Sequence, residues 1–464
     1  MMNDSSFDLI IRQGNVANAE GTPTVSDVGV RDGRIAALAP HLPGRAAREI
    51  DATGHYLFPG FIDPHTHMGI PIKTTTSADD FYSGSIAAAC GGTTTILDFT
   101  VQAAGQSLAG ALDERRALAA GRSFVDYGIH VNVTDRPGQR LAEIPPLIAA
   151  GFNSFKAFTT YREAGMMMPW ADFGPVLAQI HRHGGLLMLH AEDNDIVERE
   201  TARHLAAGHR AAIYHTRSRP PEAEAKAISD AARIALDLGA ALYIVHLSSQ
   251  AGLEAALRAR AQGAQLYLET CPHYLLLTEA AYQQPHGHYY IATPALRTQA
   301  DCDALWAALA AGEIDAIGTD HCPFTIAQKE AWEGHFERAP NGIPAVETRF
   351  PLLYTYGVAA GRISLAQMVQ LLAANPARIF GLDGHKGAIR PGLDADLVIW
   401  DPNTETTITT AQQHSRADWS PYEGWPIAGR LLYTLLRGQV LVADGAFVGD
   451  VPAGALLLAN TPPV

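Results

Sequence analysis

Eight short apolar segments alternate with longer amphipathic ones along the middle of this 464-residue chain. The apolar segments are FPGFID, TTTILDF, VDYGIHVNV, SFKAF, GLLMLH, LYIVHL, AQLYLE and DAIGTD. The segments between them, such as EAEAKAISDAARIALDLG, carry apolar residues at i, i+3 and i+4, as helices that pack on a sheet do. Eight strand–helix units over roughly 330 residues predict an α/β fold, a TIM-like (β/α)8 barrel that spans residues 58–385.

A doubly wound open sheet would also alternate strands with helices. The nucleotide-binding versions of that fold carry GxGxxG after the first strand, or GxxxxGK followed by Ser or Thr. Neither motif occurs in the sequence. The barrel is therefore the favoured interpretation.

The two ends of the chain have a different pattern from the middle. Residues 7–57 and the stretch after Lys386 alternate apolar and polar residues between Gly, Asn and Asp turn signals, which is typical of short antiparallel strands. We therefore expect residues 1–57 and 386–464 to pair into one small β-sandwich domain beside the barrel.

Charge and composition narrow the possible partners. With 34 Lys and Arg against 48 Asp and Glu, the net charge is −14, the wrong sign for a protein that neutralises nucleic-acid phosphates. No apolar run approaches the ~20 residues of a membrane span, and the amino terminus lacks the pattern of a signal peptide. Four scattered cysteines suit a reducing compartment. We expect a cytoplasmic protein with no membrane or nucleic-acid partner.

Histidine and aspartate stand where several of the predicted strands end. His65 and His67 follow FPGFID, and residues i and i+2 of an extended segment point to one side. His190, His246 and Asp320 occupy similar positions on other strands, where barrel enzymes gather their catalytic groups. The five together predict a metal site. Ordinary structural roles are favoured for His55, His181, His183, His204, His209 and His414.

Lys156 lies inside the short apolar strand SFKAF, where burial and nearby metal ions disfavour a bare ammonium. One explanation is that CO2 adds to the neutral amine, because the resulting carbamate has two oxygens that can bridge two cations. A lysine that snorkels from the strand end is the alternative. With two Zn²⁺, the carbamate, Asp320 and a shared hydroxide, the cluster would be nearly neutral, and the hydroxide would be a nucleophile at physiological pH.

Many short motifs also resemble one known family in order and spacing over nearly the whole chain. They are IDPHTH, GGTTTILDF, SFKAFTTY, LHAED, VHLSS, ETCPHYL, TPALR, GTDHCPF, PNGIPAVETR, NPARIFGL and PGLDADLVIWDP. The family is the cyclic-amidohydrolase branch that includes dihydropyrimidinase and D-hydantoinase. The resemblance implies a zinc-centred barrel, a composite β-sandwich and a homotetramer.

The resemblance also implies a role for each motif residue. One Zn²⁺ would be held by His65, His67 and Asp320 and the second by His190 and His246, with Lys156 as a bridging N6-carboxylysine. The same ligands accept Mn, Co or Fe. Asp320 would take the proton of the attacking hydroxide and pass it to the leaving nitrogen. Tyr161 would donate a hydrogen bond to the oxyanion.

Further positions follow from the same resemblance. Thr293, where many relatives have Ser, and Asn341 would bind the substrate ring, chiefly through backbone groups. We expect Cys271 and Cys322 to be structural, and His273 and His321 to orient the ligands.

The chain departs from the family after Tyr161. Gly165 and Met166, Met167 and Met168 replace bulky aromatic residues of the exocyclic pocket, with Phe158 and Ile72 as lid candidates. Thioether side chains repack easily, so we expect tolerance of varied 5-substituents.

The expected reaction is metal-dependent hydrolysis of the cyclic amide bond of dihydropyrimidines and 5-substituted hydantoins to N-carbamoyl amino acids. Allantoinase and cyclic imide hydrolase are alternatives with the same chemistry. Dihydroorotase is disfavoured because His67 is followed by Met68 and Gly69 rather than by the arginine that holds a ring carboxylate. A non-enzymatic scaffold is disfavoured because all six metal-ligand positions are kept.

Overall fold

The computed structural model describes residues 7–460. Eight parallel strands form a nearly closed barrel in the order β15-β14-β13-β12-β11-β10-β9-β6. They are β6 (Phe61–Thr66), β9 (Thr93–Phe99), β10 (Asp126–Asn132), β11 (Ser154–Phe158), β12 (Leu186–His190), β13 (Leu242–Ile244), β14 (Leu266–Thr270) and β15 (Ala316–Ile317). Thr66 and His321 bridge the first strand to the segment after the last. The predicted fold class is confirmed, with one strand in each of the eight predicted segments.

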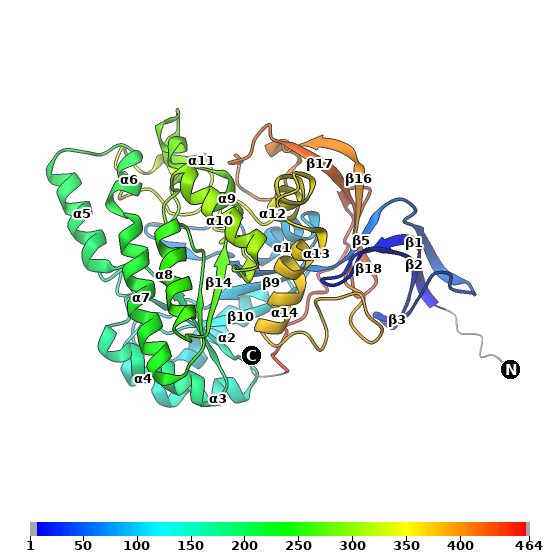
Figure 1. Cartoon of the computed structure of the whole chain (residues 1–464), viewed down its shortest axis with the longest axis horizontal. Helices are drawn as coiled ribbons and strands as arrows, with labels where there is room; N and C mark the ends of the chain where they lie inside the picture. Colours follow the sequence, from blue (N-terminus) through cyan, green and yellow to red (C-terminus); the bar gives the residue numbers. More distant parts are fainter. Residues whose placement is uncertain (1–6, 461–464) are drawn as a thin grey trace.

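Helices cover the outside of the barrel, and those in the middle of the chain, such as α7 and α8, form the green layer in Figure 1. They are α1 (Phe81–Cys90), α2 (Leu108–Ala119), α3 (Ile144–Ala149), α4 (Trp170–Arg182), α5 (Asn194–Ala206), α6 (Ile213–Ser218), α7 (Pro221–Leu238), α8 (Gln250–Ala261), α9 (Pro272–Leu276), α10 (Gln299–Ala311), α11 (Ile326–Glu330), α12 (Arg349–Leu353), α13 (Leu365–Val369) and α14 (Asn375–Ile379). Their apolar faces meet the strands in the largest hydrophobic core of the described chain. No helix among residues 7–460 is both long and apolar enough to cross a membrane.

The two chain ends form a separate nine-stranded mixed sheet. Its strands are β1 (Phe7–Val16), β2 (Thr24–Arg31), β3 (Arg34–Ala39), β4 (Ala46–Asp51), β5 (Tyr56–Pro59), β16 (Leu397–Thr407), β17 (Pro426–Leu436), β18 (Gln439–Ala443) and β19 (Ala446–Phe447). β5 lies between β1 and β16 and so joins the amino-terminal strands to the carboxy-terminal ones. β5 also crosses the domain boundary predicted between residues 57 and 58.

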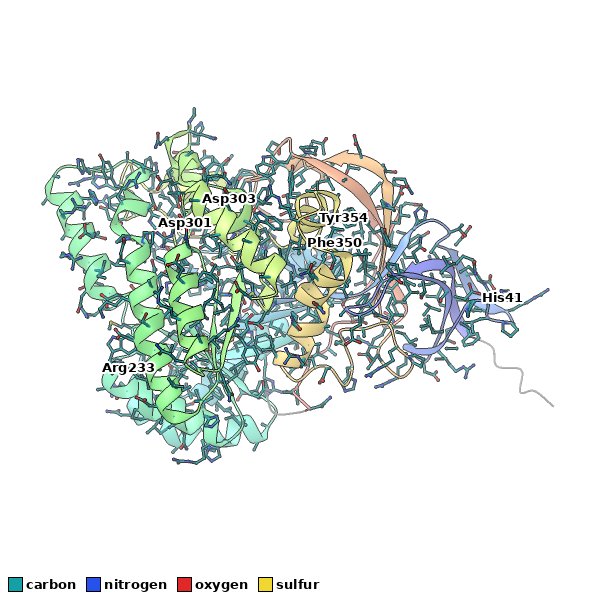
Figure 2. All side chains as sticks on the ribbon, viewed as in Figure 1. His41, Arg233, Asp301, Asp303, Phe350 and Tyr354 are labelled. Atoms are coloured by element: carbon teal, nitrogen blue, oxygen red, sulfur yellow. The ribbon has the colours of Figure 1, made fainter. Side chains whose placement is uncertain are left out.

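Aromatic residues pack the barrel against this sheet. Phe350 of α12 and Tyr354 lie beside β16 and β17 (Figure 2), and their ring centroids are 4.7 Å and 5.3 Å from that of Trp400. The chain then returns to the barrel, because the N–H of Leu457 donates to the carbonyl of Tyr127 at 2.7 Å. The sheet is therefore firmly attached to the barrel and leaves the carboxyl ends of the barrel strands to other segments.

One element has no counterpart in the prediction. Strands β7 (Pro71–Ile72) and β8 (Thr75–Thr76) form a two-stranded hairpin after β6. The amide of Gln328 donates to Thr75 Oγ1 and to the Thr76 carbonyl, both at 2.7 Å. The hairpin is thereby fixed to α11, at the same end of the barrel as the residues described next.

Candidate metal centre and active site

The carboxyl ends of the barrel strands surround a cavity of about 290 Å³. All nine metal-binding, catalytic and substrate-binding residues predicted from the sequence line it: His65, His67, Lys156, Tyr161, His190, His246, Thr293, Asp320 and Asn341. These residues are far apart along the chain and come from several strands and loops. Their convergence defines the candidate site.

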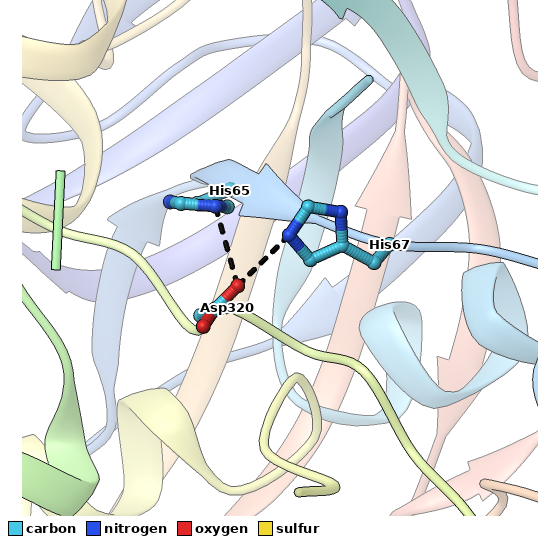
Figure 3. A group of neighbouring side chains, drawn as sticks. All are labelled: His65, His67 and Asp320. Atoms are coloured by element: carbon cyan, nitrogen blue, oxygen red, sulfur yellow. Dashed lines mark ion pairs between the residues drawn. The ribbon is translucent and has the colours of Figure 1, made fainter. Parts of the chain in front are cut away.

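His65, His67 and Asp320 form its tightest group (Figure 3). The Nε2 atoms of His65 and His67 lie 3.2 Å and 2.9 Å from Asp320 Oδ1. Burial alone would raise the pKa of Asp320, but the two histidines hold it well below its usual range. Asp320 is therefore an anion, and one of its oxygens lies close to two imidazole nitrogens. This donor set suits a divalent cation.

Glu269 orients His65 from behind. Its Oε1 lies 2.8 Å from His65 Nδ1 and accepts the N–H of His246 at 3.1 Å, while its Oε2 accepts the hydroxyl of Tyr243 at 2.8 Å. Burial raises the pKa of Glu269 to about 7. Sequence reasoning missed this residue, although it ends the strand AQLYLE just as Asp320 ends DAIGTD. Such a carboxylate fixes the ring orientation of a ligand histidine.

His190 and His246 both line the cavity, and their rings lie edge to face with centroids 4.6 Å apart. His190 Nε2 lies 2.8 Å from Glu192, which also accepts Arg219 at 2.6 Å. His246 Nδ1 is buried with no hydrogen-bond partner in the described chain. Burial lowers the pKa of both imidazoles, so both are neutral. Buried polar atoms normally have a hydrogen-bond partner, so a neutral imidazole nitrogen without one is available to bind a metal ion.

The Lys156 side chain is 1% exposed and lies between Phe99 and Phe158, whose ring centroids are 5.2 Å and 5.3 Å from Nζ. No hydrogen bond or ion pair reaches Nζ from any residue between 7 and 460. Burial lowers the pKa of Lys156 to about 7, despite the nearby charges of Glu269 and Asp320. The site thus contains a buried amine that loses its proton more easily than an ordinary lysine.

Several cavity residues, among them three of the predicted site residues, have a backbone conformation that L-residues rarely adopt. The φ angles of Tyr161, His246 and Asp320 are 68°, 39° and 50°. Each such residue costs on the order of 1–3 kcal/mol and persists only where the surrounding structure imposes it. The chain therefore accepts strain at the positions where the side chains must turn into the cavity.

The remaining predicted residues lie at the mouth of the cavity. The Asn341 amide donates to Thr293 Oγ1 at 2.7 Å, which joins the two predicted ring-binding positions. The Tyr161 ring lies 5.2 Å from that of His190, and burial raises the pKa of its hydroxyl, which stays protonated. Tyr161 is therefore available as a hydrogen-bond donor.

The accessory residues have mixed positions. The His67 N–H donates to the His321 carbonyl at 2.9 Å, and His321 Nδ1 accepts the N–H groups of Ala345 and Val346 at 3.0 Å and 3.2 Å. His321 therefore fixes the backbone next to His67. His273 is buried with both ring nitrogens unpartnered in the described residues. Cys271 and Cys322 are buried free thiols.

Of the four residues expected in the exocyclic wall, Met166 lines the cavity and Gly165, Met167 and Met168 do not. Phe158 and Ile72 also line the cavity, as expected. Met168 is fully buried in the main hydrophobic core, because the chain turns inward after Gly165, and so Met168 does not belong to the wall.

Comparison with known proteins defines the class of this fold and site. Residues 56–440 match the amidohydrolase family, and the chain belongs to that family. It is 40% identical over 454 residues to a D-hydantoinase of Ralstonia pickettii, across 97% of this chain and 98% of that one. A D-phenylhydantoinase of Escherichia coli O1:K1 is also 40% identical and covers 97% of each chain.

Solved structures agree with these relatives. The dihydropyrimidinase from Brevibacillus agri NCHU1002 superposes with a TM-score of 0.95 at 37% identity, over 98% of this chain and 99% of that one. The recognition made from the sequence motifs is thereby confirmed.

Proposed function

We propose that the protein hydrolyses the cyclic amide bond of dihydropyrimidines and 5-substituted hydantoins, giving N-carbamoyl amino acids. One observation carries this proposal: four histidines, an anionic aspartate and a readily neutral lysine converge on one cavity in a chain that is 40% identical to D-hydantoinases. A small cyclic ureide or imide is the substrate class. The close relation to enzymes named for hydantoins places allantoin and simple cyclic imides second.

The donor set fits a pair of divalent metal ions. His65, His67 and Asp320 would hold one Zn²⁺ and His190 and His246 the other, and Mn, Co or Fe would suit the same ligands. When bound, the metal ions supply an acidified water and polarise the amide carbonyl. His246 Nδ1, buried without a partner in the described chain, supports this assignment.

Lys156 would be the bridging ligand as N6-carboxylysine. Its neutral amine adds to CO2, forms one N–C bond and loses one proton, and the product is an anion with two oxygens. The buried position of Nζ, with no ion pair from the described residues, supports this step because the ammonium form is disfavoured there. The carbamate would then supply the negative charge that the buried site lacks.

Two residues would handle the proton and the developing charge. Asp320, an anion at neutral pH, accepts the proton of the attacking water and delivers it to the ring nitrogen as the C–N bond breaks. Tyr161, which keeps its proton, donates a hydrogen bond to the oxyanion. Tyr161→Phe should lower kcat by roughly 10²–10³-fold with little change in KM.

A homotetramer in the cytoplasm completes the proposal, by analogy with the family resemblance. Size-exclusion chromatography with light scattering reports the assembly directly.

The testing experiment measures ring opening of dihydrouracil, 5-substituted hydantoins, allantoin and succinimide under matched conditions, with protein purified in zinc and bicarbonate. Turnover of dihydrouracil or hydantoins, lost in Asp320→Asn, is the expected result. Turnover confined to allantoin or succinimide, or full activity in Asp320→Asn, would contradict the proposal.

A further inference from the structure

A second cavity of about 390 Å³, here called the outer chamber, adjoins the catalytic cavity. Its walls are α5, α6, the loop after β11 and residues 336–341. Lys73, Tyr161, Ala164 and Asn341 line both cavities. A substituent that leaves the substrate ring past Tyr161 and Asn341 therefore enters the outer chamber.

Lys73 places a positive charge at the junction. It occupies the turn of the β7–β8 hairpin with φ 54°, and its Nζ donates to the carbonyls of Glu337 and Ala339 at 2.7 Å and 2.6 Å. Its third hydrogen bond, to Asn341 Oδ1, is longer at 3.5 Å. A bond of this length to a neutral acceptor is weak, and a carboxylate would replace it with a stronger one. Water reaches this side chain, yet surrounding protein lowers its pKa to about 8.

Asn194 adds a second donor. Its side chain is 4% exposed and lines the outer chamber from the first residue of α5. Its Oδ1 accepts the N–H of Arg162 at 3.2 Å, which fixes the orientation of the amide. Its Nδ2 is buried without a hydrogen-bond partner among the described residues. A buried donor without a partner costs about 1–3 kcal/mol, which a ligand acceptor would recover.

The two arginines on the chamber wall already have counter-charges. Arg219 donates to Glu192 at 2.6 Å, and Arg162 pairs with Asp195 and Glu198 at 2.6 Å and 2.7 Å. Glu337 Oε1 lies 3.1 Å from His335 Nδ1, and its Oε2 is buried without a hydrogen-bond partner in the described residues. Glu163 is exposed to water. Lys73 has no carboxylate oxygen within 4 Å in the part of the chain that the structure describes.

We propose that the outer chamber binds a carboxylate carried on the ring substituent, through Lys73 Nζ and Asn194 Nδ2. The preferred substrates are then hydantoins whose 5-substituent ends in a carboxylate, and this inference rests on the proposed ring-opening activity. A side chain carries the carboxylate past Tyr161, which distinguishes it from a carboxylate bonded directly to the ring. Charge-assisted hydrogen bonds are about twice as strong as neutral ones, which sets the preference.

The experiment compares kcat/KM for three hydantoins of matched size, with 5-(2-carboxyethyl), 5-(2-carbamoylethyl) and 5-(3-methylbutyl) substituents. The wild-type protein should favour the acid over each neutral compound by roughly 10-fold. Lys73→Gln keeps donors for the two carbonyls but loses the charge, and should abolish the preference. Lys73→Arg should retain it. Asn194→Asp keeps the acceptor for Arg162 and should reverse it by like-charge repulsion.

Arg233→Met is the control for lost positive charge. Arg233 lies on α7, outside both cavities, with a side chain that is 70% exposed (Figure 2). This variant should keep the wild-type ratio of kcat/KM between the acidic and the neutral hydantoins. Equal or better turnover of the neutral hydantoins by the wild type, or an unchanged ratio in Lys73→Gln, would overturn the inference alone. Turnover of none of the three would instead overturn the proposed function.

Discussion

Lys156 and Lys386 are both buried lysines, at 1% and 4% exposure, but their surroundings are opposite. Lys156 has two aromatic rings beside its Nζ and no ion pair from the described residues. Lys386 Nζ lies 2.6 Å, 3.0 Å and 2.7 Å from carboxylate oxygens of Asp126, Asp394 and Asp396. Burial lowers the pKa of Lys156 to about 7, whereas the three carboxylates raise the pKa of Lys386 above its ordinary value.

The difference shows how one residue type serves chemistry in one place and stability in another. A charged lysine surrounded by carboxylates holds the carboxy-terminal segment to β10 of the barrel. A buried lysine without counter-charge costs stability unless it loses its charge or gains a ligand. We therefore expect substitution of Lys156 to affect turnover and substitution of Lys386 to affect stability.

The largest expected effect is the loss of turnover in Lys156→Ala. Removal of the proposed bridging ligand should lower kcat at least ~10³-fold, since a metal centre stabilises the transition state by several kcal/mol. The metal-free variant should be no less stable than the wild type, because it removes an uncompensated buried amine. Hydantoin kinetics and urea unfolding measure the two properties. Added acetate or propionate should restore part of the activity by occupying the space, and full activity without them would contradict the assignment.

Lys386→Met should show the opposite behaviour. It leaves Asp126, Asp394 and Asp396 without their shared partner, so the free energy of unfolding should fall by about 3–5 kcal/mol. The kcat of the folded variant should stay near that of the wild type. Lys226→Met is the matched control, because Lys226 is 52% exposed in its pairs with Asp193 and Asp230 and should lose less than about 1 kcal/mol. Equal losses in both variants would remove the distinction.

The two lysines also show what the sequence could predict. The eight strand segments were clear because apolar runs alternate regularly with amphipathic helices, and the strand-end rule drew attention to His65 and Asp320. Lys156 was conspicuous as a charge inside an apolar run. Two partners of Lys386, Asp394 and Asp396, lie in the segment that follows it, but Asp126 is 260 residues away along the chain, so no local pattern indicates the whole cluster.

The same limit explains the residues that the sequence did not indicate. Lys73 lies in a two-residue turn with no periodicity, and its contacts are more than 260 residues away along the chain. Met168 belongs to the core because the chain turns after Gly165, a direction that a row of methionines does not encode. Glu269 was detectable by the strand-end rule, but its ligand-orienting role depends on the neighbouring His65.

Glu269→Gln should have an intermediate effect. The amide can still contact Tyr243 and His65, but the substitution removes a negative charge that acts on Lys156. Loss of a carboxylate behind a ligand histidine typically costs 10–100-fold in metal affinity or activity. Chelator competition followed by metal analysis measures the affinity. An unchanged affinity would show that backbone contacts alone orient His65.

The smallest expected effect is a pH dependence of stability that comes from His130, a buried histidine near Lys156. Burial, with the charge of Lys156 among the lesser causes, lowers the pKa of His130 to about 3. Folded His130 therefore stays neutral while the unfolded chain takes up its proton near the ordinary pKa of about 6.5. Between these two values acid stabilises the unfolded state, so the free energy of unfolding falls as pH falls, by up to ~1.4 kcal/mol per pH unit.

His130→Gln removes that one titration while its amide can still donate to the Pro64 carbonyl, which His130 Nε2 contacts at 3.0 Å. Urea unfolding of the metal-free protein at pH 7 and pH 5.5, at fixed protein concentration, should show a smaller acid loss in the variant, by roughly 1 kcal/mol. Lys386 keeps its charge across this range because its pKa is raised, so Lys386 itself does not contribute to the acid loss of the wild type. An equal acid loss in His130→Gln and the wild type would mean that other histidines carry the dependence.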